Sequence, residues 1–356
     1  MKEITALDLH FMEKELKVIE GGHLDKMYQW PEGEFVFKIN TKNGKKNLRI
    51  KIPGLIFLSE KPFTAPTKIL GFCQYLRKHL LNARIHSVEQ KDFERIIQLK
   101  LTKGQGEFLL IIELFKPGNI VLCDTEMNIL NCFERQIYKD REIKPKIKYQ
   151  YPPVQFNIKT GEIVEAIKNS NKILSKALAI DLVLSGKYSD EITTRSKIDK
   201  NKETKDLNEK EIKELQNQIN FLLNQKIKPF ISGKEAYPIE MQTKIPEKEC
   251  SSFSEAVEYF QEVLVAKKEE VSVEHIKEIS ILESQKKRLR SLEKEHAEEQ
   301  KKGEYIYEHY SEFETLLRKV NELKKTKSFK EIKELLKENK HFKDLNEKEK
   351  KIILEF

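Results

Sequence analysis

The chain has 356 residues, too many for one ordinary globular domain, so two or three structural modules are expected. Charged residues make up 35% and hydrophobic residues 38% of the sequence, a balance typical of a globular part joined to long solvated helices. No stretch approaches the roughly 20 apolar residues that a membrane-spanning helix requires, and the segment near Met1 does not resemble a signal peptide. These features argue against a membrane protein and predict a cytoplasmic one that does not contact membranes.

The reactive residue types indicate neither disulfide nor metal chemistry. The four cysteines are scattered without a C-x-x-C pair, and the eight histidines do not cluster along the sequence. Common enzyme motifs such as G-x-S-x-G, H-E-x-x-H and the Walker lysine loop are also missing. We therefore expect a protein that is not an enzyme and that holds no metal or other cofactor.

Basic charge is concentrated in one part of the chain. The formal net charge is +8, and residues 41–160 contain 22 Lys and Arg against 11 Asp and Glu. A basic globular part favours a polyanionic partner such as a nucleic acid. Alternatively, the excess of basic residues reflects the general composition of the organism's proteins, for example in a heat-adapted organism whose protein surfaces are rich in lysine and glutamate. Charge alone leaves both interpretations open.

Residues 1–153 carry the patterns of an α+β head, the first part of a longer unit. Apolar residues at helical spacing predict a helix over 4–21 with Thr5 as its N-cap, and a second helix over 71–85. Short apolar runs separated by turn residues, including a hairpin turn at Asn43-Gly44, predict antiparallel strands. The expected strands lie within 23–30, 34–40, 47–59, 83–90, 94–101, 107–115, 119–124 and 128–134. These elements predict two antiparallel layers with helices packed on them. We expect the head to end at residues 151–153.

A helical module is expected over 154–230. Its short apolar helices meet at Ser185-Gly186-Lys187, a turn that aims backbone N–H groups at a phosphate or serves as an ordinary helical hairpin. A strand pair and a helix that begins near Ser252 or Ser251 close the head over 231–270.

The last part of the chain is predicted to be an arm. Residues 271–326 favour a coiled coil, because a seam repeats with 4-3-4-3 spacing at Ile306, Tyr310, Phe313, Leu317 and Val320. Residues 327–356 favour a helix and a terminal strand of an incomplete unit. The apolar run KKIILEF is expected to pair with further chain or with a separate partner, because an unpaired strand edge promotes association.

Several stretches together resemble one known family. They are ITALDLHFMEKEL, HLDKMYQW, FCQYLRKHL, FERIIQLKL, LLIIELFKPGNIVLCD, REIKPKIKYQYPP, SFSEAVEYF and GEYIYEHY. In this order they resemble the NFACT family, which includes fibronectin-binding protein A-like and NEMF-like factors of ribosome-associated quality control. The resemblance extends from Ile4 to the C-terminus and covers the N-terminal and first coiled-coil portions of the family.

The resemblance implies a factor that recruits tRNA. Such proteins bind a large ribosomal subunit that still holds peptidyl-tRNA after a stall, and they position a charged tRNA for untemplated tailing of the stuck chain. The ribosome performs the peptide transfer, so the protein supplies binding and orientation. Family members usually continue into a returning coiled-coil helix and a further RNA-binding domain, which implies either a fragment or a separate C-terminal half as a partner.

The resemblance also implies which residues handle the tRNA: Asp8, Glu94 and Arg95. Arg95 offers a planar fork to a phosphate or base edge, and the carboxylates orient that fork or accept from bases and ribose hydroxyls. Many relatives carry Asp in place of Glu94, so the reach of this side chain differs here. Alternatively, these charged residues form a purely structural salt bridge at the rim of the sheet.

Other positions are candidate contacts to RNA phosphates. They are Arg77, Lys78, Lys42, Lys45, Lys46, Gly186 and Lys187. For the two residues on the second helix, the alternative is the solvated face of an amphipathic helix. Ser185 stands where relatives often have a second glycine, which weakens the expectation of a phosphate contact from its turn.

Two other functions are alternatives to tRNA recruitment. The layout also resembles formamidopyrimidine-type DNA glycosylases, and an alternative is a nucleic-acid-binding protein with that fold but without catalysis. Glu3 matches the glycosylase pattern, whereas Lys2 occupies the position of the nucleophilic proline and no four-cysteine finger is present. A surface adhesin, the second rival, is disfavoured by the missing export signal.

Overall fold

The computed structural model describes residues 3–154, 156–346 and 351–354, with side chains for all of these except 262–280 and 283. The chain divides into two compact units, residues 1–266 and 267–356. In the part of the chain that the structure describes, no helix combines the length and apolar composition needed to cross a bilayer.

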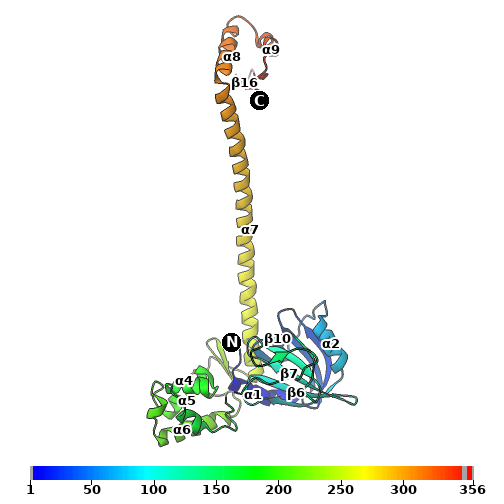
Figure 1. Cartoon of the computed structure of the whole chain (residues 1–356), viewed down its shortest axis with the longest axis vertical. Coiled ribbons are helices and arrows are strands. Elements are labelled where there is room, and N and C mark those ends of the chain that lie inside the picture. Colours follow the sequence, from blue (N-terminus) through cyan, green and yellow to red (C-terminus); the bar gives the residue numbers. More distant parts are fainter. Residues whose placement is uncertain (1–2, 155, 347–350, 355–356) are drawn as a thin grey trace. The chain divides into compact units, whose positions relative to one another are not determined.

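The first unit is built on one antiparallel sheet of nine strands, drawn in blue to cyan in Figure 1. The strands are β1 (His23–Gln29), β2 (Glu34–Thr41), β3 (Gly44–Lys51), β4 (Leu55–Ser59), β5 (Arg84–Gln90), β6 (Ile96–Lys103), β7 (Gly106–Glu113), β8 (Asn119–Cys123) and β9 (Ile129–Cys132). Their spatial order is β4-β3-β2-β1-β5-β6-β7-β8-β9. The predicted hairpin turn is confirmed: Thr41 pairs with Gly44, whose φ of 98° suits glycine.

The two predicted layers are the halves of this single sheet, which corrects the expected architecture. The halves meet where β1 pairs with β5 through His23 and Arg84. Apolar side chains of both halves, such as Phe37 and Leu99, belong to one buried core. β7 and β8 are buried on both faces, since Ile111 and Val121 face a second apolar cluster on the other side. Alternation of side chains along a strand explains how neighbouring residues reach opposite cores.

Two helices of this unit pack against the sheet: α1 (Ala6–Leu16) and α2 (Gly71–Leu80). Thr5 caps α1 as predicted, because its hydroxyl accepts a hydrogen bond from the Asp8 backbone N–H at 3.1 Å. Leu9 and Met12 of α1 face the sheet core, whereas Leu7 and Phe11 face the core of the helical module. α1 is therefore buried from two sides and joins the two parts of the unit.

The helical module lies beside the sheet and is drawn in green in Figure 1. It contains α3 (Ile163–Lys168), α4 (Leu174–Lys176), a π-helical turn (Ala177–Asp181), α5 (Ser185–Ser196) and α6 (Glu209–Leu223). The small strands β12 (Phe230–Ser232), β13 (Glu235–Tyr237) and β14 (Lys248–Glu249) follow it. Residues 185–187 form the first turn of α5 rather than the connection before it, which corrects the predicted position of the hairpin.

The long helix α7 (Phe253–Glu308) starts on the first unit. Ser252 caps it as predicted, since its hydroxyl accepts from the Glu255 backbone N–H at 3.0 Å. Phe253 and Val257 pack into the sheet core.

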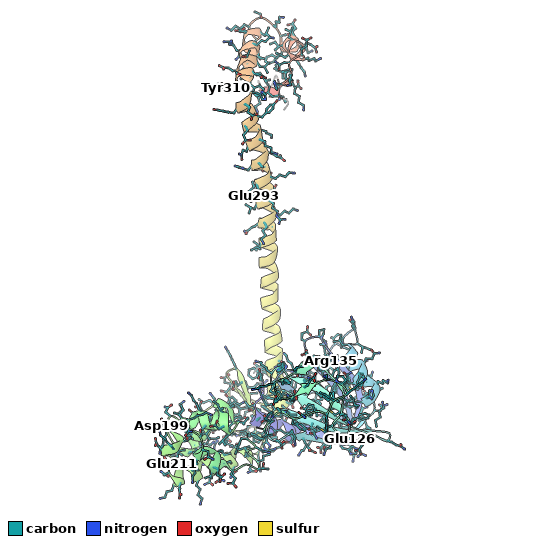
Figure 2. The ribbon with its side chains drawn as sticks, in the orientation of Figure 1. Glu126, Arg135, Asp199, Glu211, Glu293 and Tyr310 are labelled. Atoms are coloured by element: carbon teal, nitrogen blue, oxygen red, sulfur yellow. The ribbon has the colours of Figure 1, made fainter. Side chains whose placement is uncertain are left out.

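The second unit contains the rest of α7, then α8 (Tyr310–Leu323), α9 (Phe329–Leu336), β15 (Phe342–Asn346) and β16 (Lys351–Leu354). Side chains around Glu293 stand out from α7 in Figure 2, and Leu289 and Leu292 are more than half exposed. Among the described side chains no second helix covers this stretch, so the coiled coil stays a prediction. The sequence also predicts an earlier, looser seam at Ile279, Leu282, Leu289 and Leu292, of which Ile279 lies outside the described side chains.

Two expectations for the end of the chain are corrected. The seam from Ile306 to Val320 does not run along one helix, because α7 ends at Glu308 and α8 begins at Tyr310. Val320 packs instead with Ile332 of α9 in a small core of this unit. The described part of KKIILEF is β16, which pairs with β15 within the chain rather than only with an outside segment.

Candidate functional site

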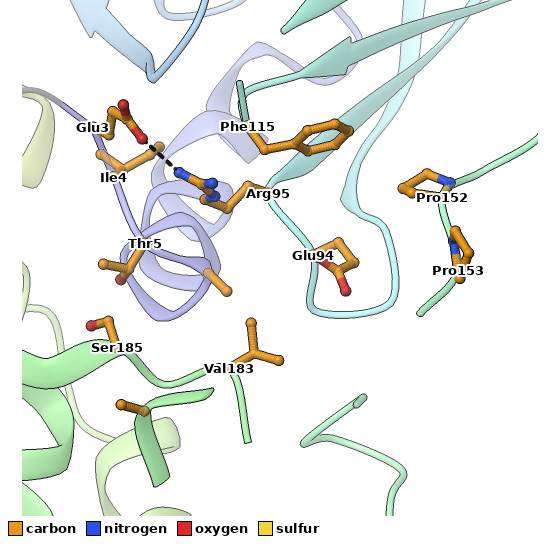
Figure 3. Close-up of a pocket in the computed structure, with 12 residues that line it drawn as sticks. Glu3, Ile4, Thr5, Glu94, Arg95, Phe115, Pro152, Pro153, Val183 and Ser185 are labelled. Atoms are coloured by element: carbon orange, nitrogen blue, oxygen red, sulfur yellow. Dashed lines mark hydrogen bonds and ion pairs between the residues drawn. The ribbon is translucent and has the colours of Figure 1, made fainter. Parts of the chain in front are cut away.

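A cavity of about 520 Å³ lies where the start of α1, the connection between β5 and β6, and the helical module meet. Glu94 and Arg95 line it from the sheet side, and Val183 and Ser185 line it from the module (Figure 3). The structure thus brings together two of the three predicted tRNA residues and the residue that precedes Gly186. These residues are far apart in the sequence.

The acid–arginine pair is held by a tight connection before β6. Asp92 and Phe93 both adopt left-handed backbone conformations, with φ of 45° and 60°. Such conformations cost free energy in residues other than glycine and persist only where packing enforces them. Here the ring of Phe93 is 1% exposed and packs into the core of the helical module. The anchored ring fixes the direction in which Glu94 and Arg95 leave the turn.

Arg95 and Lys116 share one carboxylate at the cavity. Arg95 Nη1 lies 2.9 Å from Glu3 Oε2, and Lys116 Nζ lies 2.7 Å from Glu3 Oε1. The hydrogen bond from Lys116, followed by the bond and charge of Arg95, lowers the pKa of Glu3 below its ordinary value. Arg95, Lys116 and Glu3 together carry a formal charge of +1, which the Glu94 carboxylate in the cavity wall balances. Arg95 and Lys116 are both partly exposed, so they are the groups that an anionic ligand at the cavity would contact.

A pH dependence follows from Glu3. Its lowered pKa means that the ion pairs stabilise the fold fully above the unfolded-state pKa and stop doing so as the pH falls through the folded-state pKa. We expect the stability difference between the wild type and Glu3→Gln to be constant above about pH 5 and to shrink at lower pH. Urea unfolding at a series of pH values measures this difference. A difference that stays constant into the acid range would contradict the ion pairs.

Asp8 is fully buried and bound from three sides. Its carboxylate accepts hydrogen bonds from Lys187 Nζ at 2.8 Å, from the Tyr188 hydroxyl at 2.6 Å and from the Thr5 backbone N–H at 2.8 Å. The Lys187 ammonium also lies 5.0 Å from the ring centres of Tyr188 and Tyr237. Burial, followed by the Asp8 charge and hydrogen bond, raises the pKa of the Tyr188 hydroxyl well above its ordinary value. Tyr188 therefore remains a neutral donor.

In this structure Asp8 therefore positions α5 rather than presenting a carboxylate to a ligand. It holds Lys187 and Tyr188 in the first turns of α5, whose start lines the cavity. Val183 and Ser185 are left-handed, with φ of 57° and 65°, and the buried Ser185 Oγ has no hydrogen-bond partner in the described structure. A strained turn with an unsatisfied hydroxyl is a common feature of binding sites.

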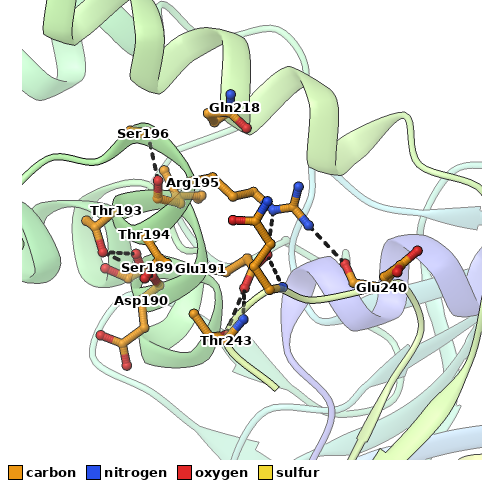
Figure 4. A network of polar contacts seen from close by, with 12 residues as sticks. Ser189, Asp190, Glu191, Thr193, Thr194, Arg195, Ser196, Gln218, Glu240 and Thr243 are labelled. Atoms are coloured by element: carbon orange, nitrogen blue, oxygen red, sulfur yellow. Dashed lines mark hydrogen bonds and ion pairs between the residues drawn. The ribbon is translucent and has the colours of Figure 1, made fainter. Parts of the chain in front are cut away.

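A second carboxylate, from the middle of α5, stabilises the packing of this helix (Figure 4). Glu191 is buried and accepts from the backbone N–H groups of Gln242 and Thr243 at 2.7 and 2.9 Å. Burial alone would raise the pKa of Glu191, but these hydrogen bonds and the one from Arg195 outweigh it and lower the pKa. Glu191 thereby fastens the segment after β13 to α5.

The remaining candidate cations lie away from this cavity. Arg77 donates two hydrogen bonds to the Met27 carbonyl, one from Nε at 2.7 Å, and so has a structural role. Lys78 on the same helix is exposed. In the β2–β3 hairpin, Lys42 and Lys45 are exposed, and Lys46 pairs with Glu60. None of these five residues lines the cavity.

Sequence reasoning missed the role of Glu3 and Lys116 at this site. Glu3 was singled out only as a possible glycosylase residue, whereas here it binds Arg95. Lys2, at the position of the glycosylase nucleophile, lies outside the described residues. Lys116 precedes the turn after β7 and carried no local signal other than its positive charge.

Comparison with known proteins places this chain in a family. Residues 5–353 match the family model that is described as "NFACT N-terminal and middle domains". The chain belongs to the NFACT family. This NFACT protein is 31% identical over 376 residues to the archaeal Rqc2 homolog aRqcH of Methanocaldococcus jannaschii, a match that covers 95% of this chain and 55% of the relative. It is 29% identical over 174 residues to ribosome quality control complex subunit 2 of Saccharomyces cerevisiae, covering 48% of this chain and 16% of that protein.

Solved structures share the fold of the first unit. The N-terminal part of the fibronectin/fibrinogen-binding protein from Streptococcus suis has a TM-score of 0.61 at 22% identity, covering 73% of this chain and 99% of that chain. The fibrinogen binding protein from Staphylococcus aureus has a TM-score of 0.61 at 18% identity, covering 72% of this chain and 98% of that chain. The NFACT protein itself spans 55% of the length of its archaeal relative.

Proposed function

We propose that this NFACT protein is a cytoplasmic ribosome-associated quality-control factor that binds stalled large ribosomal subunits carrying peptidyl-tRNA. It recruits a charged tRNA for untemplated C-terminal tailing, and the ribosome performs the transfer. The family match over residues 5–353 supports this proposal, as do archaeal and yeast relatives whose names refer to Rqc2 and to ribosome quality control. The protein acts by binding and orientation, not as an enzyme.

The cavity beside Arg95 is the proposed tRNA contact, and it is the observation that carries the proposal. Among the described residues, the guanidinium donates a hydrogen bond to Glu3, which leaves most of its five N–H donors for a ligand. Lys116 adds a second cation that is 75% exposed. A planar guanidinium recognises phosphates and base edges in a bidentate manner. Single-stranded or unstacked RNA offers both groups.

The two carboxylates have different roles in this proposal. Glu94 lies in the cavity wall and is positioned to orient a ligand or accept from its amino or hydroxyl groups. Asp8 acts through Lys187 and the first turn of α5, which brings the exposed Gly186 to the same region. A direct contact between Asp8 and tRNA would require α5 to move away from α1.

The arm is proposed to work as one half of a coiled coil. Ile281, Leu282, Leu289 and Leu292 are each more than half exposed on α7. A second helix, supplied by further chain or by a separate C-terminal half, would cover them.

Co-sedimentation with purified large ribosomal subunits tests the proposal. We expect the wild type to pellet selectively with subunits that carry peptidyl-tRNA and to retain a small set of tRNA species. Arg95→Ala should lower tRNA retention by about 10- to 100-fold, the cost of losing a charge-assisted hydrogen bond. Its thermal stability should change little, because the ion pair is partly exposed.

Lys100→Ala is the matched control. Lys100 is an exposed cation on β6, five residues from Arg95, and pairs with Glu89 at 3.7 Å outside the cavity. This variant should retain tRNA like the wild type. Failure of the wild type to bind blocked subunits, also when a C-terminal half is supplied, would refute the proposal. Equal losses of stability and tRNA binding in Arg95→Ala would identify a structural ion pair instead.

A further inference from the structure

Three potential metal ligands come together in the second unit. His309 lies between α7 and α8, Glu312 lies in the first turn of α8, and His341 immediately precedes β15. One ligand atom from each residue, an imidazole nitrogen or a carboxylate oxygen, lies within 4.8 Å of the ligand atoms of the other two. His309 and His341 are distant in the sequence, yet the fold brings their ring centres to 5.1 Å from each other. A separation of 32 residues hid the cluster in the sequence.

The ligand atoms are spaced for a small divalent cation. His341 Nε2 lies 2.9 Å from Glu312 Oε2, and His309 Nδ1 lies 3.6 Å from Glu312 Oε1. Ligands about 2.0–2.1 Å from a tetrahedral zinc ion lie roughly 3.3 Å from each other. The side chain of Glu312 is 58% exposed and that of His309 is 31% exposed. Both side chains therefore have room to rotate until their ligand atoms reach this spacing. The side chain of His341 is 9% exposed and provides the fixed ligand.

A hydroxyl group orients the fixed ligand. Tyr305 Oη lies 3.0 Å from His341 Nδ1, the nitrogen on the far side of the ring from Glu312. Phe313 packs against the same imidazole with its ring centre 5.5 Å away. Metal-binding histidines commonly donate their second N–H to such a partner, which fixes the tautomer and turns the free nitrogen towards the metal. Tyr305 lies near the end of α7, four residues before His309, so this stretch of chain provides one ligand and the group that orients another ligand, His341.

We propose that His309, Glu312 and His341 form a binding site for zinc or a similar divalent transition metal. Two neutral imidazoles and one carboxylate are nitrogen and oxygen donors that suit this class of ion, and three protein ligands leave a fourth position for water. Metal binding at His341 Nε2 requires the tautomer whose single ring proton is on Nδ1, from which it donates a hydrogen bond to the Tyr305 hydroxyl oxygen. The proton lost from Nε2 is matched by the one gained at Nδ1, so the imidazole stays neutral.

Bound metal would cross-link the junction between α7 and α8 to the β15–β16 strand pair. His309 and Glu312 belong to the break between α7 and α8, whereas His341 begins the β15–β16 hairpin. The apolar cluster of this unit is small, with five buried residues among those that the structure describes. Metals commonly stabilise units whose apolar core is small. The proposal is independent of ribosome binding and stands or fails separately from it.

Titration of the full chain with Zn²⁺ tests the site. Isothermal calorimetry should show one ion bound per chain, and the visible bands of Co²⁺ should report tetrahedral coordination. Zn²⁺ should also raise the temperature at which the second unit unfolds. His309→Ala and Glu312→Gln should each weaken binding by at least about 10- to 100-fold, since losing an outer partner alone costs that much. Tyr305→Phe should weaken it by about 10-fold.

His296→Ala provides the control, because His296 is an exposed histidine on α7 outside the cluster. It should bind Zn²⁺ like the wild type. Circular dichroism checks that each variant keeps its helices, and His309 and Glu312 are chosen because neither is buried. Wild type that binds no Zn²⁺, or Zn²⁺ binding that survives in His309→Ala and Glu312→Gln, would overturn the proposal. The first outcome would leave Glu312 as an ordinary hydrogen-bond acceptor of His341.

Discussion

Replacing Asp8 with alanine is expected to lower the free energy of unfolding of the first unit by about 3–5 kcal/mol. The substitution leaves the Lys187 ammonium, whose side chain is 13% exposed, without its carboxylate, and it leaves the buried Tyr188 hydroxyl without its acceptor. It also removes the side chain that bonds back to the Thr5 backbone N–H at the start of α1. Urea unfolding followed by the fluorescence of Trp30, the single tryptophan, reports on this unit.

Second-site variants separate charge from packing in this prediction. Adding Lys187→Met to Asp8→Ala should recover at least about 1 kcal/mol, because the variant then buries no unpaired charge. Asp8→Asn should cost less than Asp8→Ala, since the amide oxygen still accepts hydrogen bonds. Loss of tRNA binding in Asp8→Asn at nearly wild-type stability would show a direct contact with tRNA. A change of less than about 0.5 kcal/mol in Asp8→Ala would contradict the buried network.

Glu113→Ala is expected to have an effect of similar size, again about 3–5 kcal/mol. Both Glu113 oxygens bind the Arg141 guanidinium, at 2.6 and 3.2 Å, and the Tyr149 hydroxyl donates to the same carboxylate at 2.6 Å. Burial, and after it the Glu113 charge, raises the pKa of Tyr149, which therefore stays a neutral donor. Arg141 is 4% exposed at its side chain, so the variant would strand a buried cation.

The position of Glu113 gives this stability effect a functional consequence. Arg141 also binds the Gln150 carbonyl at 3.2 Å, and this segment leads directly into Pro152 and Pro153 of the cavity wall. We expect tRNA retention to fall together with stability. Glu142→Ala is the control, because Glu142 forms a partly exposed pair with Lys144 and should change stability by less than about 0.5 kcal/mol. Equal effects of the two variants would argue against a special role for Glu113.

Local patterns were sufficient for the elements that position the site. Thr5 and Ser252 begin their helices as their side-chain chemistry predicts, and Gly44 forms the expected turn. These features depend on interactions between residues a few positions apart, which a sequence displays directly. The joining of the two layers into one sheet was not predictable in the same way, because it depends on a short pairing of distant segments around His23 and Arg84.

For the candidate site, the residue types were identified but not their partners. Arg95 was selected from the sequence, yet its ion pair with Glu3 spans 92 positions. Asp8 was expected to face a ligand, whereas the fold buries it against Lys187, 179 positions away. Whether a charged side chain is available or already bound depends on what packs over it. That information is absent from local sequence.

The sequence by itself determined the class of protein, the alternation of strands, the helix starts and the concentration of basic charge, because composition and short-range spacing encode these properties. Only the tertiary structure decided which charges are paired, that Asp8 acts through α5, and that His309 and His341 meet. Each of these depends on contacts between distant segments, whose free energies arise from burial and geometry once the chain has folded.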